Sequence, residues 1–301
     1  MDNYELISDY HDNKHYNSEL MSLVKRQAKG CFEEWMVKNQ WIDNYIPASL
    51  VNDDNEIVIT MGIIKTNLYI KEKQVKAYQF GEILYRDGVP NESLKEILFK
   101  KVIDKYSNIA DIIFTHSLED RSVLLENGFK EFEEFIYFIP WNGEDSQVGS
   151  AVKKLDFDNF KDIEFLKTEI KYSTRHARLL SSNGDSEIKL YNVLRHYRRN
   201  VYYIPSLSTT VVFTISGNVF RLVAMFTKKD VDLMTLLKTI VPKEMKYIEF
   251  GFIPNLPSLY IKKMENYVTP SITQKNYLLI NEITTKLTDI KISFPIIARQ
   301  K

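Results

Sequence analysis

Three strand-like runs in succession constrain the fold of this 301-residue chain more than any other feature of its sequence. They span 48–51, 56–69 and 75–85, and polar turns over 52–55 and 71–74 separate them. Runs joined by such short polar turns are typical of antiparallel neighbours. The sequence therefore predicts an antiparallel meander near the start of the chain.

A helix and a buried strand follow the meander. After a loop over 86–92, apolar residues recur on one helical face from Leu94 onward. Ser93 and Glu96 form a Ser-x-x-Glu capping box, so we expect this helix to begin near Ser93. The run 111–116 is apolar without alternation, which is typical of a strand that is buried on both faces.

Shorter elements complete the first half of the chain. The pattern predicts a strand at 4–9 and a helix from Tyr16 before the meander. After the buried strand it predicts a short helix over 119–127 that ends at Gly128. Aromatic-rich strand material over 129–141 is then expected to close the domain.

A polar, glycine-containing stretch over 142–150 divides the chain into two parts. We expect a first domain over 1–141 and a second over 151–301, in keeping with ~100–200 residues per domain. The second part repeats much of the order of the first, which favours a tandem duplication of one mixed α/β architecture over an unrelated α+β domain. The elements predicted there are strands at 152–157, 201–204, 209–215, 219–226, 246–252 and 276–280, and helices over 159–180, 187–198, 230–241 and 258–266.

Composition limits the class of protein. Lys plus Arg equals Asp plus Glu, 40 against 40, so no net charge attracts nucleic acid or anionic lipid, and we expect neither partner. Cys31 is the single cysteine, which excludes an intrachain disulfide and a cysteine metal cluster. The sequence has no signal-peptide pattern and no apolar run of about 20 residues, so we expect a cytoplasmic protein without a membrane span.

Two local patterns are interpreted as surface features. His11 and His15 have a helical metal-ligand spacing, but no third ligand is in view, and we predict no metal site. The basic stretch 195–199, with Arg175 and Arg178, could meet RNA or a nucleotide phosphate. A solvated helix face is the favoured interpretation of this stretch.

The order of elements in the first half predicts a particular kind of binding site. Where two neighbouring strands separate, one strand edge keeps backbone N–H and C=O groups that an extended amide can satisfy. The helix that follows points its N-terminal N–H groups at a phosphate. Acetyl-CoA carries both groups, an amide-containing pantetheine arm and a pyrophosphate.

The first half resembles the GNAT superfamily of acetyl-CoA-dependent N-acyltransferases. The stretch from 46–50 through 75–85 looks like the central sheet of that family. Residues 116–129 are similar to its closing segment, Asn-x-x-Ala-x-x-x-Tyr-x-x-x-Gly-Phe. The resemblance covers about 4–141 and implies a GNAT-like first domain, followed by a second, degenerate one. It also implies transfer of an acetyl group from acetyl-CoA to a primary amine of a small molecule or peptide.

The resemblance further implies which residues hold the donor. The pantetheine arm would lie along the strand that ends at Tyr85, with the pyrophosphate over the turn that follows. The family's glycine-rich phosphate loop falls on 90–95, which contains no glycine. Glu92 adds negative charge there, and Lys95 partly offsets it. The implied contacts are Ile83, Leu84, Tyr85, Asn91, Glu92, Ser93, Leu94, Lys95 and Ser117.

The catalytic groups depart from the family pattern. The general-acid tyrosine of the family falls at Leu124, which cannot donate a proton, and its asparagine falls at Ser117. Protonation of the departing thiolate would then need Tyr85 or water. Glu82 is the first candidate for the general base and His116 the second, because their strand ends converge on one cleft. The alternative is a catalytically inactive GNAT-like binding or scaffold protein, which the missing glycines and tyrosine favour.

Overall fold

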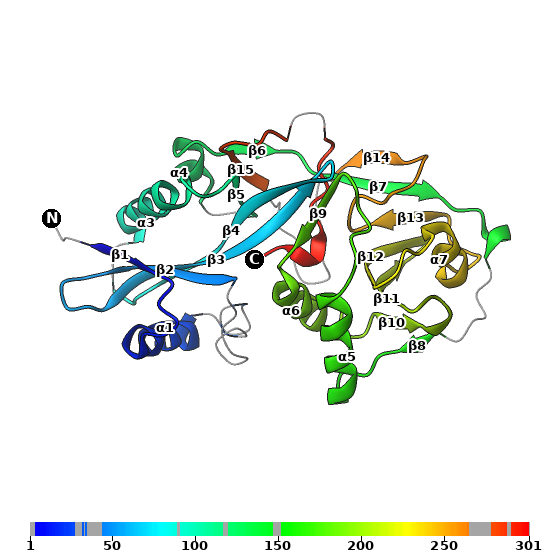
Figure 1. Cartoon of the computed structure of the whole chain (residues 1–301), viewed down its shortest axis with the longest axis horizontal. Helices are drawn as coiled ribbons and strands as arrows, with labels where there is room; N and C mark the ends of the chain where they lie inside the picture. Colours follow the sequence, from blue (N-terminus) through cyan, green and yellow to red (C-terminus); the bar gives the residue numbers. More distant parts are fainter. Residues whose placement is uncertain are drawn as a thin grey trace.

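Two mixed β-sheets form the framework of the protein (Figure 1). The structure is a computed structural model and describes residues 4–27, 32, 34, 44–88, 91–116, 120–146, 152–264, 278–287 and 290–300. Helices pack against both sheets, so the expected mixed α/β fold class is confirmed. None of the helices in these ranges is long and apolar enough to cross a membrane.

The first sheet contains the antiparallel meander that the sequence predicts. Its strands are β1 (Glu5–Ser8), β2 (Tyr45–Val51), β3 (Ile57–Ile70), β4 (Lys73–Tyr85), β5 (Ile112–Thr115), β6 (Lys130–Phe132), β9 (Leu180–Asn183) and β15 (Leu278–Glu282). The order across the sheet is β1-β2-β3-β4-β5-β15-β6, and β9 pairs with β3. β2, β3 and β4 are antiparallel neighbours, whereas β4 and β5 run parallel.

Helices cover both faces of the first sheet because successive strand residues point to opposite faces. Leu84 packs with α1 (Lys14–Gln27), whereas Ile83 and Tyr85 pack on the side of α3 (Asn91–Tyr106) and α4 (Arg121–Glu126). α3 begins two residues earlier than predicted. Ser93 therefore lies in the first turn and not at the cap, which flanks a helix.

The second sheet repeats this plan with different strands. They are β7 (Phe135–Pro140), β8 (Lys153–Lys154), β10 (Val201–Ile204), β11 (Thr209–Ser216), β12 (Val219–Thr227), β13 (Tyr247–Phe250) and β14 (Tyr260–Lys263), in the order β14-β7-β13-β12-β11-β10-β8. Three helices that the structure describes pack on it, α5 (Phe160–Lys171), α6 (Ser186–His196) and α7 (Leu233–Ile240). The helix predicted over 258–266 is wrong, because β14 pairs with β7 there and pairing overrides a local helical pattern.

The two halves of the chain exchange strands. β7 leaves the first sheet and pairs with β13 and β14 in the second. β15 returns to the first sheet and pairs with β5 and β6. Two predictions are therefore wrong. The stretch 129–141 does not close the first domain, because β7 lies in the second sheet. The strand predicted at 276–280 does not belong to the second domain, because β15 lies in the first sheet. A strand pattern is local, whereas the choice of partner is tertiary.

The boundary that the sequence predicts at 142–150 stays a prediction. Within it the structure describes the 3-10 turn η1 (Gly143–Asp145) and Ser146, and 147–150 lie outside the described residues. The strand exchange means that the halves on either side of this boundary complete one another's sheets.

The C-terminal segment 290–300 runs between the two sheets (Figure 1). Its turn η3 (Ile296–Ala298) is anchored to the second sheet, where the Ile296 N–H donates to the Gly251 carbonyl at 3.0 Å. Further along, the guanidinium of Arg299 makes two hydrogen bonds to the carboxylate of Glu134, at 3.0 and 2.8 Å, and both side chains are buried. Removing one partner alone would leave a buried charge uncompensated, at a cost of about 3–5 kcal/mol.

Candidate functional site

The parallel strands β4 and β5 separate part of the way along the first sheet. They pair from Ala77 with Ile112 to Phe80 with Thr115, where β5 ends. β4 continues to Tyr85, so residues 81–85 present an edge beyond the last paired residue of β5. Such an edge offers backbone donors and acceptors to an extended amide. The separation of strands that the sequence predicts is therefore present.

A β-bulge lies at the point of separation. Phe80 pairs with Ile63 and Ile83 with Met61, so Gly81 and Glu82 together oppose one residue of β3. A bulge bends the strand and redirects its side chains, and it is common beside active sites. Glu82, the first candidate base, lies on this bulge and is exposed. Because of the bulge, the Glu82 side chain departs from the regular alternation of side chains between the two faces of β4.

The C-terminal segment approaches Gly81 closely. A Cβ atom at this position would collide with the carboxamide of Gln300. The neighbouring Gln79 side chain donates to the Ala298 carbonyl at 3.0 Å and accepts from the Gln300 N–H, in the amide orientation that satisfies both groups. The C-terminal segment thus reaches the bulge of β4, a contact that the sequence pattern did not predict.

The three strand residues predicted to line the pantetheine arm face different ways. Ile83 and Tyr85 are half-buried on the α3 side of the sheet. Leu84 is buried on the opposite side, in the cluster formed with α1. Its side chain is committed to that core, so only its backbone is placed to meet a ligand along the edge.

Lys95 is held by protein groups within the first turns of α3. Its ammonium lies 2.8 Å from the carboxylate of Asp120 and 5.9 Å from the centre of the Tyr85 ring. Burial alone would lower the pKa of Lys95, but the hydrogen bond and charge of Asp120, together with Tyr85, outweigh burial and raise it. Burial raises the pKa of Tyr85, and the hydrogen bond from Lys95 partly offsets this rise. Burial therefore favours a protonated Tyr85 at the end of β4, with Lys95 and Asp120 beside it.

The first turn of α3 keeps the negative charge that the sequence places there. The Glu92 carboxylate is 3.7 Å from Lys95 and its side chain is 83% exposed. Ser93 is exposed beside it, whereas Leu94 is buried in the core. Asn91 begins the helix, and Ser117 lies outside the described residues. The helix end is thus placed after β4 as predicted, with a carboxylate at its positive pole.

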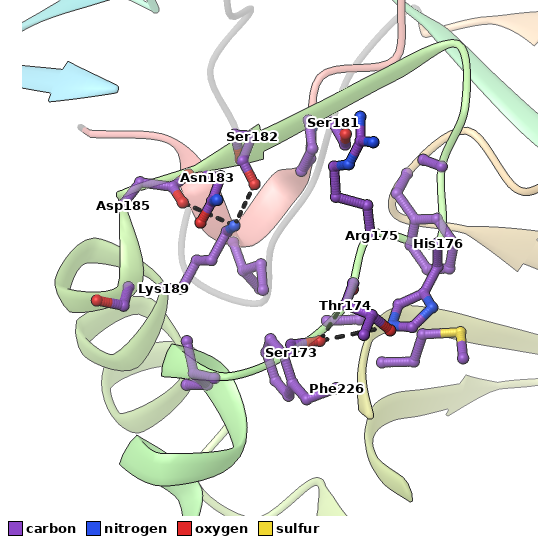
Figure 2. Close-up of a pocket in the computed structure, with 18 of the residues that line it drawn as sticks. Ser173, Thr174, Arg175, His176, Ser181, Ser182, Asn183, Asp185, Lys189 and Phe226 are labelled. Carbon is purple, nitrogen blue, oxygen red and sulfur yellow. Dashed lines mark hydrogen bonds and ion pairs between the residues drawn. The ribbon is translucent and has the colours of Figure 1, made fainter. Parts of the chain in front are cut away.

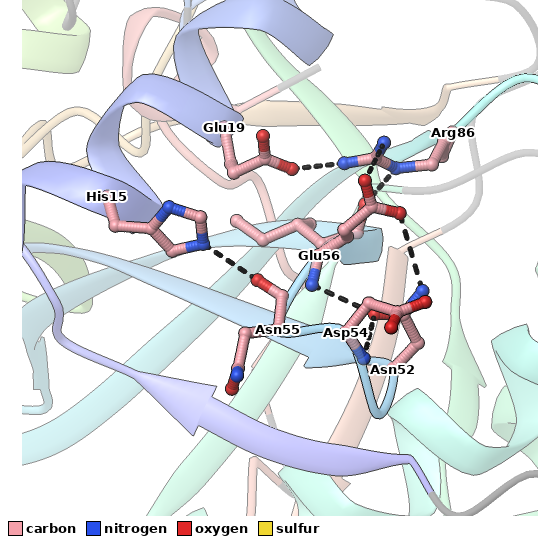
Figure 3. A network of polar contacts seen from close by, with 8 residues as sticks. His15, Glu19, Asn52, Asp54, Asn55, Glu56 and Arg86 are labelled. Carbon is pink, nitrogen blue, oxygen red and sulfur yellow. Dashed lines mark hydrogen bonds and ion pairs between the residues drawn. The ribbon is translucent and has the colours of Figure 1, made fainter.

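Arg86 and Gly88 follow β4 in the chain, and neither was a predicted contact. Arg86 follows β4 directly, and its guanidinium pairs with Glu19 of α1 and with Glu56, at 3.3 Å from the latter (Figure 3). Its Nε also donates to the Ile57 carbonyl at 2.9 Å. Gly88 has a φ of +81°, which glycine adopts without strain. The sequence signals that could have marked them are a basic residue and a glycine in this loop. They lie two to four residues before position 90, where the family's phosphate loop begins when it is aligned without gaps.

His116, the second candidate base, is enclosed. Its side chain is fully buried at the end of β5, with its ring centre 5.2 Å from that of Phe294 in the C-terminal segment. Nε2 lies 3.8 Å from the same Glu134 carboxylate that pairs with Arg299. An incoming amine would reach His116 only if the C-terminal segment moved. Glu82 and His116 therefore differ in access, one exposed and one covered.

The second half repeats the bulge and the separation. β12 is bulged at Val223, since Leu222 pairs with Phe213 and Ala224 with Val212, and β12 runs parallel to β13 as far as Leu222. Beyond that point the chain itself occupies the end of the edge, because the Thr174 N–H donates to the Thr227 carbonyl at 2.8 Å. The following helix α7 is capped by Asp232, whose carboxylate accepts from the Thr235 N–H at 2.8 Å. The positive N-terminal end of α7 is therefore already paired with the carboxylate of Asp232.

Two bulged strands, each separating from a parallel neighbour and each followed by a helix, define a tandem GNAT-like fold. Each half contains the arrangement, and each half contributes strands to the other's sheet, β7 from the first half and β9 and β15 from the second. A solved GCN5-related N-acetyltransferase has the same fold over 93% of this chain. The resemblance that the sequence suggests is therefore confirmed at the level of fold.

Three solved structures illustrate the likeness. A conserved protein of unknown function from Enterococcus faecalis V583, described as a probable N-acyltransferase, is 13% identical, with a TM-score of 0.57 over 94% of this chain and 73% of its own. Eis1 from Mycobacterium abscessus is 10% identical, with a TM-score of 0.52 over 94% and 74%. A GCN5-related N-acetyltransferase from Kribbella flavida is 12% identical, with a TM-score of 0.50 over 93% and 71%. No protein-family model and no curated protein matches the sequence.

Proposed function

We propose that the protein is an N-acyltransferase that uses acetyl-CoA in its first half. The observation that carries this proposal is the bulged, separated edge of β4 over Gly81–Tyr85, followed directly by α3. The edge fits the amide groups of a pantetheine arm, and the α3 end offers backbone N–H groups to a pyrophosphate. The Glu92 carboxylate opposes the pyrophosphate, so the fit is better for the arm than for the phosphates.

The proposed reaction is direct transfer. The nitrogen of a primary amine forms a bond to the thioester carbonyl carbon, the carbon–sulfur bond breaks, and the sulfur leaves with its electron pair as a thiolate. Glu82 takes a proton from the amine, directly or through water, because it is exposed at the bulge. His116 remains the second candidate for this role, behind the C-terminal segment.

Tyr85 supplies a proton to the thiolate in this proposal. It occupies the end of β4, and Lys95 and Asp120 orient it from α3 and from the start of α4. The raised pKa of Tyr85 keeps the hydroxyl protonated at neutral pH, which a proton donor requires. Tyr85 thus takes over the role of the tyrosine that Leu124 replaces.

Titration with acetyl-CoA tests the proposal. We expect binding by calorimetry, a rise in melting temperature equivalent to ~2.7 kcal/mol at ~100 times Kd, and release of free thiol when a primary amine is added. The variant Tyr85→Phe should bind acetyl-CoA as the wild type does and lose about 100-fold in kcat. Tyr69→Phe, on β3, is the matched control and should lose nothing. A protein that neither binds acetyl-CoA nor releases thiol would contradict the proposal.

A non-catalytic binding protein is the second candidate. The contact of Gln300 with the β4 bulge favours it, because the protein's own chain lies where the reacting groups would meet. This candidate predicts that acetyl-CoA binds without thiol release, for any amine tested. The two candidates therefore differ in turnover and not in binding.

A further inference from the structure

A cavity lies at the bulge of β12, on the side of the C-terminal segment away from β4. Its volume is about 330 Å³, and its lining comes from β12, β9, the start of α6, the segment 173–177 and the residues around Ile297 (Figure 2). We name it the β12 cavity. It is distinct from the β4 edge to which the proposed function assigns the acyl donor, and it has one polar and one apolar wall.

Two neighbouring serines of β9 line the polar wall, and their side chains point to opposite faces of the sheet. Ser181 and Ser182, on β9, are 8% and 9% exposed. Within the part of the chain that the structure describes, neither hydroxyl oxygen has a hydrogen-bond partner. Burying a hydroxyl without a partner is unfavourable, so such groups are a sign of a ligand that completes them.

The buried polar wall carries no net charge. The Lys189 ammonium lies 2.7 Å from the Asp185 carboxylate and donates to the Ser182 carbonyl at 3.0 Å, so these two charges neutralise each other. Burial lowers the pKa of His176 to about 4, against a smaller opposite effect of Asp230, and His176 is therefore uncharged at neutral pH. The Arg175 guanidinium also lines the cavity and pairs with Glu72 at 3.4 Å. A ligand group buried at the polar wall is therefore uncharged, since the charges beside it are already paired.

The apolar wall suits an aromatic ring. It contains Val223 and Phe226 of β12, with Phe252 and Ile297. Rings pack well against rings and branched side chains. A cavity of about 150 Å³ admits benzene, so 330 Å³ admits a body of about ten heavy atoms.

The C-terminal segment connects this cavity to the β4 bulge. Ile297 lines the cavity, and Gln300, three residues later, approaches Gly81. Three residues span at most about 10 Å. We propose that the β12 cavity holds the uncharged body of the acceptor, an aromatic or similarly apolar group with a hydroxyl, whose amine sits on a short chain directed at the β4 bulge. This inference rests on the proposed function and names its acceptor class.

Binding of four small molecules, measured by calorimetry without any acyl-CoA, tests the cavity. Tyramine has the hydroxyl, the ring and the amine; p-cresol lacks the amine; phenethylamine lacks the hydroxyl; spermidine has amines alone. We expect tyramine and p-cresol to bind and phenethylamine to bind about tenfold more weakly, the loss of about one well-made hydrogen bond. Spermidine should not bind. Tight spermidine binding, or no binding of either phenol, would overturn the inference.

Serine variants test where the phenols bind. Ser181→Ala with Ser182→Ala removes both hydroxyls without adding volume. We expect this variant to bind tyramine and phenethylamine equally, while the ligand-free protein melts higher by ~2 °C, because two unsatisfied buried groups are gone. Ser216→Ala, an exposed serine at the end of β11, is the control and should change neither value. If the double serine variant keeps the full preference for tyramine over phenethylamine, tyramine binds elsewhere and the inference is wrong.

The two proposals fail separately. If p-cresol and tyramine bind with the expected serine dependence but tyramine is never acetylated, the β12 cavity stands as a binding site and the acyltransferase proposal fails. If other amines are acetylated while neither phenol binds, the acyltransferase stands and the acceptor class is wrong.

Discussion

At the scale of single residues, the positive charges near the β4 edge are already matched by carboxylates. Asp120 pairs with Lys95, and Glu19 and Glu56 pair with Arg86. A pyrophosphate bound there would meet cations whose charge is largely neutralised and a carboxylate, Glu92, at the helix end. The site as it stands thus favours backbone N–H groups over side-chain charges as phosphate contacts.

Glu92→Gln tests this balance. The substitution removes the charge and keeps the shape, so we expect acetyl-CoA to bind up to about fivefold more tightly at low salt. The free protein should lose ~0.3–1 kcal/mol, because an acid in the first turn stabilises a helix. Glu96→Gln, one turn further along α3, controls for a general charge effect. Weaker binding by Glu92→Gln would instead make Glu92 a ligand contact, and our placement of the pyrophosphate would be wrong.

At the scale of elements, the sequence predicted the strands of the first sheet far better than their partners. The meander over β2–β4, the helix α3 and the buried strand β5 appear where hydrophobic periodicity and turn residues put them. No local pattern predicts the bulge at Gly81, or which strands pair with β7 and with β15. Bulges and strand partners are set by contacts between distant residues. The burial of His116 could not be predicted either. The local pattern places this histidine at the end of a strand, but the residue that covers it, Phe294, comes from the far end of the chain.

The candidate site was predicted in part for the same reason. Tyr85 and Lys95 lie beside one another as the strand-loop-helix order requires. Asp120, which fixes Lys95, and Gln300, which approaches Gly81, come from other elements, and local pattern gives no sign of either contact. The roles assigned to Glu82, His116 and the donor contacts stay predictions.

At the scale of the whole molecule, the exchange of β7 and β15 ties the halves together. Tyr137 and Ile139 of β7 are buried in one apolar cluster with Phe114 of the first sheet and Phe250 of the second. Neither half can complete its sheet from its own residues alone. The molecule is therefore expected to unfold as a unit.

Cleavage between the halves tests this expectation. A protease site built into 147–150 would cut the chain at the predicted boundary. We expect the two fragments to stay associated in gel filtration and to unfold in one thermal transition, because separating them would expose β7 and β15. Two fragments that elute apart, each with its own cooperative transition, would show that the exchange contributes little. The uncut protein carrying the same insertion is the control.

Hydrogen exchange in the presence of acetyl-CoA tests whether the donor binds along the β4 edge. We place the donor on the β4 edge in the first half and not on the β12 edge, whose end the chain's own Thr174 covers. Saturating acetyl-CoA should therefore slow exchange of the backbone amides in peptides covering 81–88 and 91–95, and leave peptides covering 223–230 unchanged. Protection over 223–230, or saturable binding with no protection of the β4 edge, would contradict this placement.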